Sequence, residues 1–114
     1  MYKRQVHLPE EQLHGLEVTD RLVADWAAGL KDEGADLRRA ASMAKYVATE
    51  ACSAVVDSAL QVHGGAGFMR ESEIERLYRD CRVLRIFEGT SQIQLLGIAA
   101  SAPTSSLDVL GGVA

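Results

Sequence analysis

The sequence is poor in the residues that cross-link or stiffen a small protein, with two cysteines, two prolines and 5% aromatic residues among 114. Two cysteines cannot build the disulfide framework of a small secreted protein, and neither Cys52 nor Cys81 has a partner at metal-ligand spacing. We therefore expect both to be packing residues, no bound metal, and a reducing compartment. With so few aromatic rings, the core must consist of aliphatic side chains.

The sequence also lacks basic clusters and long apolar runs. Its net charge is −4 at pH 7, whereas nucleic-acid binding requires clustered Lys and Arg, so no nucleic acid is expected as a partner. No apolar run approaches the ~20 residues that span a bilayer. His7 and Pro9 interrupt the first apolar stretch, which argues against a signal peptide. A cytoplasmic protein without a transmembrane segment is expected.

The five residues from Met1 to Gln5 look unrelated to the remainder. They resemble a translated sequencing adapter, so that residues 1–8 are either a cloning or sequencing scar or an ordinary disordered N-terminus. A scar would mean that the natural protein continues upstream. We expect a helical domain over residues 9–101 and a flexible tail over residues 102–114.

Apolar residues recur at spacings of three and four, which predicts an all-α, four-helix-bundle-like fold without strands. The first expected helix covers Pro9–Leu30, and Gly34 follows its end. The second follows Asp36 as N-cap and carries a narrow, alanine-rich apolar stripe, so that neighbouring helices can come close. The four residues 64–67 should end it, because several positive-φ positions require glycine.

Two shorter helices complete the expected fold. The third begins at Ser72, which forms a capping-box pattern with Glu75, and ends near Leu84. The fourth begins near Thr90 and reaches Ala100. These boundaries place a short loop, with an acidic residue in it, between the third and fourth helices.

Two stretches carry polar groups in patterns that also have plain structural readings. Residues 61–67 combine Gln61 with a glycine-rich helix end, where backbone N–H groups can approach a ligand, but a simple helix cap has the same composition. Residues 75–80 contain two acid–base pairs at i,i+4 spacing, which are typical of an ion-paired surface helix.

A third stretch, residues 85–94, contains the strongest candidate for chemistry. Glu88 follows two apolar residues and precedes a helix N-terminus; an apolar setting would raise its pKa into the range of a general base. Thr90 and Gln92 add polar groups near free helix N–H groups. An interhelical loop with a threonine cap is the plain alternative.

Taken together, these motifs resemble the C-terminal helical domain of the acyl-CoA dehydrogenase family. The resemblance is carried by Met-Ala-Lys at 43–45, Gln-Val-His-Gly-Gly-Ala-Gly-Phe at 61–68, Glu-Arg-Leu-Tyr-Arg-Asp at 75–80 and Ile-Phe-Glu-Gly-Thr-Ser-Gln-Ile at 86–93. It covers roughly three quarters of this chain and about a quarter of a full-length enzyme, so we expect an N-terminally truncated enzyme that is inactive alone.

The resemblance implies a flavoenzyme with FAD as cofactor and acyl-CoA as substrate. In this family, FAD accepts a hydride from Cβ while a glutamate removes the α proton, giving the trans-2-enoyl-CoA. Electrons then pass to an electron-transferring flavoprotein. Glu88 matches the catalytic base, and its backbone N–H matches a donor to the thioester carbonyl. Gly89 matches a position in the substrate site.

The resemblance also implies cofactor-binding residues and an oligomer. Thr90, Ser91 and Gln92 match positions that contact the flavin. A second set matches the stretch that meets the nucleotide half of FAD, commonly across a subunit interface: Gln61, His63, Gly64 and Gly65. A dimer or tetramer formed through the helical bundle follows, and a location in the mitochondrial matrix if the source is eukaryotic.

Two alternatives remain open. One is an acyl-CoA oxidase of the same fold, which differs in its electron acceptor. The other is a catalytically inactive, stand-alone helical module that acts by association. Among dehydrogenases, residues 67–69 and 85–88 resemble long-chain types.

Overall fold

The computed structural model describes residues 10–102, which form four α-helices and contain no strand in that range. They are α1 (Glu10–Asp32), α2 (Arg38–Phe68), α3 (Glu73–Leu84) and α4 (Ser91–Ala100). The predicted all-α fold is confirmed. Our expectations for residues 1–8, including the scar, and for residues 103–114 lie outside the described residues.

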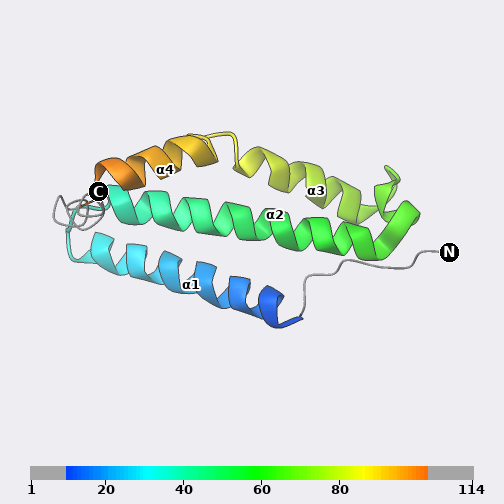
Figure 1. Ribbon diagram of the computed structural model, residues 1–114, viewed down its shortest axis with the longest axis horizontal. Coiled ribbons are helices and arrows are strands. Elements are labelled where there is room, and N and C mark those ends of the chain that lie inside the picture. The colour runs from blue at the N-terminus through cyan, green and yellow to red at the C-terminus, as the bar shows by residue number, and fades with distance from the viewer. Residues whose placement is uncertain (1–9, 103–114) are drawn as a thin grey trace, which may run out of the picture.

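The longest helix, α2, lies at the centre of the molecule (Figure 1). It has α1 along one side, and α3 and α4 follow one another along the other side. Each of the three packs on α2, whereas α1 contacts neither α3 nor α4. The bundle is therefore open: its helices form layers on either side of α2 and do not close around a common core.

The packing against α2 relies on small side chains. Ala40 and Ala51 are the only fully buried apolar side chains among residues 15–102. This agrees with the alanine-rich stripe read from the sequence, because alanine lets helix backbones approach closely. Large apolar side chains lie instead on the surface, and Phe68 is 76% exposed. Trp26 of α1 is 47% exposed, because α1 packs on one neighbour only.

The connection from α1 to α2 follows the expected turn with one correction. Gly34 has a φ of +70° after the end of α1, as a helix-ending glycine should. The N-cap of α2 is Leu37, not Asp36. The Asp36 carboxylate still accepts a hydrogen bond from the backbone N–H of Arg38 at 3.1 Å, and it pairs with the Arg38 guanidinium at 2.8 Å. This pairing lowers the pKa of Asp36 to about 2.

The glycines near the end of α2 act differently from our expectation. Gly64, with φ +60° and ψ −146°, kinks the helix, which nevertheless continues to Phe68. Gly65 and Gly67 do not have positive φ values. Position 67 has no space for a side chain, because a Cβ there would lie 2.6 Å from the His63 Cβ. The glycines thus bend and tighten the helix before it ends.

The starts of α3 and α4 are capped differently. Ser72 is the N-cap of α3, but its side chain makes no capping bond. Glu75 binds Arg79 at 2.7 Å, as the i,i+4 spacing predicted, so the capping box is wrong. Thr90 caps α4 as predicted, since its hydroxyl accepts a hydrogen bond from the Ile93 N–H at 3.3 Å.

The glycine pair near the kink provides a matched test of the packing. Gly67→Ala should lower the free energy of unfolding by about 1–3 kcal/mol, because the new methyl group must displace His63. Gly65→Ala is the control: nothing lies within 4 Å of its Cβ position, so it should leave stability unchanged or raise it by about 0.4–1 kcal/mol. Urea unfolding followed by circular dichroism measures both. Equal effects of the two substitutions would contradict the close packing at Gly67.

Candidate active-site loop

The loop between α3 and α4 has an unusual backbone. Glu88 has a φ of +53° and is the only non-glycine residue with positive φ in the part of the chain that the structure describes. Gly89 follows with a φ of +90°. A left-handed conformation costs a residue with a side chain about 1–2 kcal/mol, and it persists only where surrounding contacts determine it.

One set of contacts comes from α2. The Lys45 ammonium donates hydrogen bonds to the carbonyl oxygen of Phe87, at 2.6 Å, and to that of Gly89. It also lies 5.7 Å from the centroid of the Phe87 ring, within the range of a cation–π interaction. Lys45 therefore fixes the peptide groups on both sides of Glu88.

A second set of contacts comes from α4. The side-chain amide of Gln94 donates to the carbonyl oxygens of Glu88 at 3.1 Å and Gly89 at 3.2 Å. All three carbonyls of residues 87–89 thus accept hydrogen bonds from side chains. The backbone N–H of Glu88, in contrast, has no acceptor among residues 10–102. The loop presents this N–H as an available donor.

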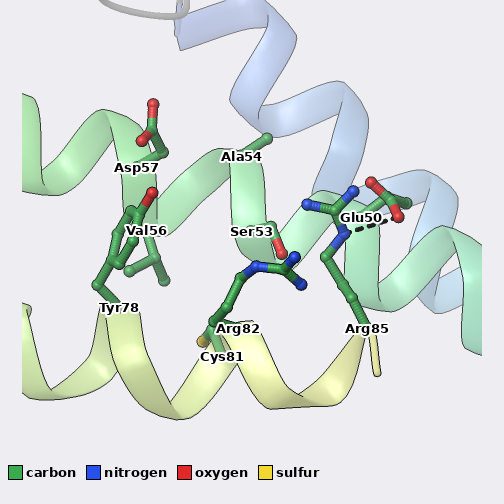
Figure 2. Close-up of a pocket in the computed structure, with 9 residues that line it drawn as sticks. All are labelled: Glu50, Ser53, Ala54, Val56, Asp57, Tyr78, Cys81, Arg82 and Arg85. Carbon is green, nitrogen blue, oxygen red and sulfur yellow. Dashed lines mark hydrogen bonds and ion pairs between the residues drawn. The ribbon is translucent and has the colours of Figure 1, made fainter. Parts of the chain in front are cut away.

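The two ends of the loop are joined to α2 through Glu50. Its carboxylate accepts hydrogen bonds from Arg85 Nε at 2.8 Å and from the Ser91 hydroxyl at 2.6 Å. Figure 2 shows Arg85 reaching from the end of α3 to Glu50. Ser91 is only 6% exposed. Because these groups are partly or fully screened from water, the pair holds the loop more firmly than a surface ion pair would.

The side chain of Glu88 is exposed, which differs from the apolar enclosure expected from the sequence. The flanking Ile86 and Phe87 are themselves 52% and 47% exposed. Nothing within residues 10–102 covers this acid, so the apolar residues of this part of the chain do not enclose it. The carboxylate and the free N–H are open to whatever packs on the loop.

The three residues expected to contact the flavin lie together. Thr90, Ser91 and Gln92 line one side of a cavity of about 210 Å³ between the end of α3 and the start of α4. The Gln92 N–H has no backbone acceptor within residues 10–102. Hydroxyl, amide and helix N–H groups of this kind fit a polar part of FAD, but the cavity is too small for the whole cofactor.

The other expected FAD-binding residues lie elsewhere. Gln61, His63, Gly64 and Gly65 are exposed near the C-terminal end of α2. Lys45, which contacts the Glu88 loop, lies 19 positions before Gly64. This corresponds to about 28 Å along a helix at 1.5 Å per residue. The structure therefore does not bring the two sets together within this chain. The His63 ring is held locally, because its Nδ1 donates to the Ala59 carbonyl at 2.8 Å.

A further cavity of about 320 Å³ lies between α2 and α3 (Figure 2). Acidic side chains line it from α2 and basic ones from α3, and none of the predicted site residues is among them. No cluster of three or more potential metal ligands occurs in the described part of the chain. No described helix has both the length and the apolar character needed to cross a membrane.

The sequence analysis did not assign a role to the residues that hold the loop, namely Lys45, Glu50 and Gln94. A signal for the first two was present. Between residues 40 and 60, an otherwise apolar and small-residue segment, the only charged residues are Lys45, Glu50 and Asp57. Isolated charges in a helix expected to be central need partners from other elements.

Comparisons with known proteins relate most of the chain to one family. The pattern of the family described as "Acyl-CoA dehydrogenase, C-terminal domain" matches residues 13–102. The caffeyl-CoA reductase-Etf complex subunit CarC of Acetobacterium woodii is 46% identical over 84 residues, which are 74% of this chain and 22% of that protein. The mitochondrial short-chain specific acyl-CoA dehydrogenase of Bos taurus is 46% identical over 79 residues, 69% of this chain and 19% of its own length.

Solved structures agree with this relationship. The crystal structure of a probable acyl-CoA dehydrogenase from Mycobacterium abscessus is 41% identical, with a TM-score of 0.71, over 76% of this chain and 23% of that one. A chain from a study of the electron transferring flavoprotein of Acidaminococcus fermentans is 30% identical, with a TM-score of 0.75, over 80% of this chain and 24% of its own. The present chain spans about a fifth of the length of the curated relatives it matches.

The role of Lys45 can be tested by removing its ammonium group. Lys45→Met keeps an unbranched apolar side chain but leaves the carbonyls of residues 87 and 89 without this donor. Because hydrogen bonds to charged groups contribute about 1.5–3 kcal/mol, the Ser91 amide, which donates to the Arg85 carbonyl, should exchange its hydrogen about 10-fold faster or more.

Hydrogen-exchange mass spectrometry of the peptide that covers residues 85–94 measures this effect. Lys31→Met serves as the control, because Lys31 is an exposed lysine at the end of α1, far from the loop in sequence. Unchanged exchange in the Lys45 variant would show that the loop keeps its shape without this residue.

Proposed function

Because this chain belongs to the acyl-CoA dehydrogenase family and matches that family's C-terminal domain, we propose that it supplies the loop that carries the catalytic base of an FAD-dependent acyl-CoA oxidoreductase. The observation that carries the proposal is the Glu88 loop. Its strained backbone is held from α2 and α4, and it presents a carboxylate and an unpaired N–H from the same residue. Strain of this kind, maintained by surrounding contacts, is typical of functional sites.

The two groups of Glu88 suit proton abstraction next to a thioester. A C–H beside a carbonyl becomes acidic enough only when donors stabilise the enolate oxygen that forms. In the proposed reaction the Glu88 N–H donates to the thioester carbonyl, and the Glu88 carboxylate removes the proton from Cα. Gly89 would lie in the substrate site beside the acid, and it has no side chain because a Cβ there would lie 2.8 Å from the Gln94 amide. FAD, when bound, supplies the acceptor for the hydride that leaves Cβ.

Within the chain, Thr90, Ser91 and Gln92 would hold the flavin end of the cofactor, since their polar groups line one cavity beside the loop. Gln61, His63, Gly64 and Gly65 would hold the nucleotide half of a second FAD, on a neighbouring subunit. Their distance from the loop along α2 supports this division. It also supports a homo-oligomer, as do the large apolar side chains exposed on the described helices.

The direction of the reaction follows from the partner that supplies or removes electrons. The names of the relatives include both dehydrogenases and reductases, among them a 3-(aryl)acrylate reductase of Clostridium sporogenes. We favour oxidation of acyl-CoA to the 2-enoyl-CoA, with an electron-transferring flavoprotein as acceptor, and a cytoplasmic or mitochondrial-matrix location. The bovine and human relatives are named as short-chain specific acyl-CoA dehydrogenases, so the preference for long-chain types is not carried into the proposal.

Reduction of a 2-enoyl-CoA is the second candidate, which the reductases among the relatives favour. In that direction Glu88 acts as an acid and returns a proton to Cα, because forward and reverse reactions share one transition state. Anaerobic titration of the full-length flavoprotein separates the two. Flavin bleached by a saturated acyl-CoA indicates a dehydrogenase, and reduced flavin reoxidised by an enoyl-CoA without bleaching by the saturated ester indicates a reductase.

The role of Glu88 is tested in the full-length protein that contains this chain. Glu88→Gln should preserve folding and flavin binding, because the amide has nearly the shape of the acid and the Thr90 cap remains. The rate of flavin reduction by acyl-CoA should fall by about 10²–10⁴ or more. Glu88→Asp, which keeps a base at shorter reach, should lose less.

Stopped-flow absorbance of the flavin measures these rates. Glu71→Gln, an exposed acid between α2 and α3, is the matched control and should retain the wild-type rate. A Glu88→Gln variant that reduces its flavin at close to the wild-type rate would exclude Glu88 as the base.

The 114-residue chain alone should not retain FAD. Its flavin-contacting and nucleotide-contacting residues lie far apart, and a partial site must still offset the full entropy cost of association. Gel filtration after incubation with FAD should therefore yield colourless protein. Stoichiometric yellow cofactor in the protein peak would show that this chain builds a complete site.

A further inference from the structure

The two cysteines of the chain meet between α2 and α3. Cys52 lies on α2 and Cys81 on α3, 29 positions apart in sequence, yet their Sγ atoms are 2.9 Å apart. Both are free thiols and only partly buried. The sequence analysis treated each as an isolated packing residue, and no spacing rule would have paired them.

We propose that Cys52 and Cys81 form a reversible redox pair, in which a low-molecular-weight disulfide oxidises the two thiols to an intramolecular disulfide that cross-links α2 to α3. A disulfide bond is about 2.05 Å long, so the two sulfur atoms need to approach by only about 0.9 Å. Small rotations of the two side chains can supply this movement.

The surroundings indicate the order of the two steps. Cys81 lines the cavity of about 320 Å³ between α2 and α3, whereas Cys52 does not (Figure 2). Burial, followed by the contact with Cys81, raises the pKa of Cys52 to about 11. At neutral pH Cys52 is therefore a thiol and a poor first nucleophile. Cys81 is the residue that an oxidant reaches first.

With glutathione disulfide as oxidant, the chemistry balances in two exchanges. The Cys81 thiolate attacks one glutathione sulfur, the glutathione S–S bond breaks, and one glutathione leaves as a thiolate. Cys52 then loses its proton to solvent and attacks the Cys81 sulfur of the mixed disulfide, which releases the second glutathione. Two protein thiols are oxidised, and one glutathione disulfide is reduced to two glutathiones.

The position of the pair links it to the Glu88 loop. Cys52 lies two residues after Glu50, and Cys81 lies one helical turn before Arg85, so the cysteine contact and the Glu50–Arg85 ion pair join neighbouring positions of α2 to the C-terminal end of α3. A disulfide there would fasten α3 to α2 beside this anchor. Oxidation would thereby reduce the freedom of the segment that leads into the loop.

The test compares the folded chain with the same chain in urea. Each sample is equilibrated with mixtures of glutathione and glutathione disulfide, alkylated and weighed as intact protein. We expect the folded chain to lose the mass of two hydrogen atoms, to resist alkylation and to remain a monomer on a non-reducing gel. Its intramolecular disulfide should be favoured at least about 10-fold over that of the unfolded chain, because folding brings the two thiols together.

Two outcomes would overturn the proposal: equal disulfide formation in folded and unfolded samples, or glutathione adducts and chain-to-chain dimers as the main products. Thermal unfolding gives an independent measurement. Oxidation should raise the Tm of the wild-type chain by about 10 °C, whereas Cys81→Ala, which keeps a single thiol, should show no rise. A wild-type Tm that stays constant or falls on oxidation would show that the native contact does not accommodate the bond.

Discussion

Three consecutive carbonyl oxygens, those of residues 87–89, accept hydrogen bonds from side chains of α2 and α4, and the shape of the candidate site depends on them. Lys45 binds the first and the third, and Gln94 binds the second and the third. With the carbonyls directed to these donors, the backbone at Glu88 stays left-handed and its N–H remains unpaired. One set of contacts thus accounts for both the strain in the loop and the donor that the loop presents.

The arrangement of α2 makes these contacts possible. Buried alanines such as Ala40 and Ala51 let the flanking helices lie close to it. Lys45 and Glu50, both in the first half of α2, can then reach the loop across a short gap. Each forms hydrogen bonds with groups more than thirty residues away in sequence. The small buried residues therefore also help to position the loop, because they set the helix spacing across which Lys45 and Glu50 must extend.

What the sequence could reveal was local. Periodicity predicted the four helices, and the Thr90 cap, the Gly34 helix end and the Glu75–Arg79 pair all follow from spacings of a few residues. Contacts between distant positions could not be read in this way. The partners of Lys45, and the space that excludes a side chain at Gly67, depend on how helices pack, and the exposure of Glu88 depends on what covers the loop. The resemblance to a family predicted site positions, whereas the structure showed which neighbours hold the loop at residues 87–89.

The separation of α1 from α3 and α4 has a consequence for how the chain opens. Among residues 10–102, α1 packs on α2 alone, whereas α3 and α4 both pack on α2, and Gln94 of α4 binds the loop between them. Detachment of α1 would break none of the hydrogen bonds that shape the loop. We therefore expect α1 to detach as a separate unit while α2, α3, α4 and the Glu88 loop stay folded.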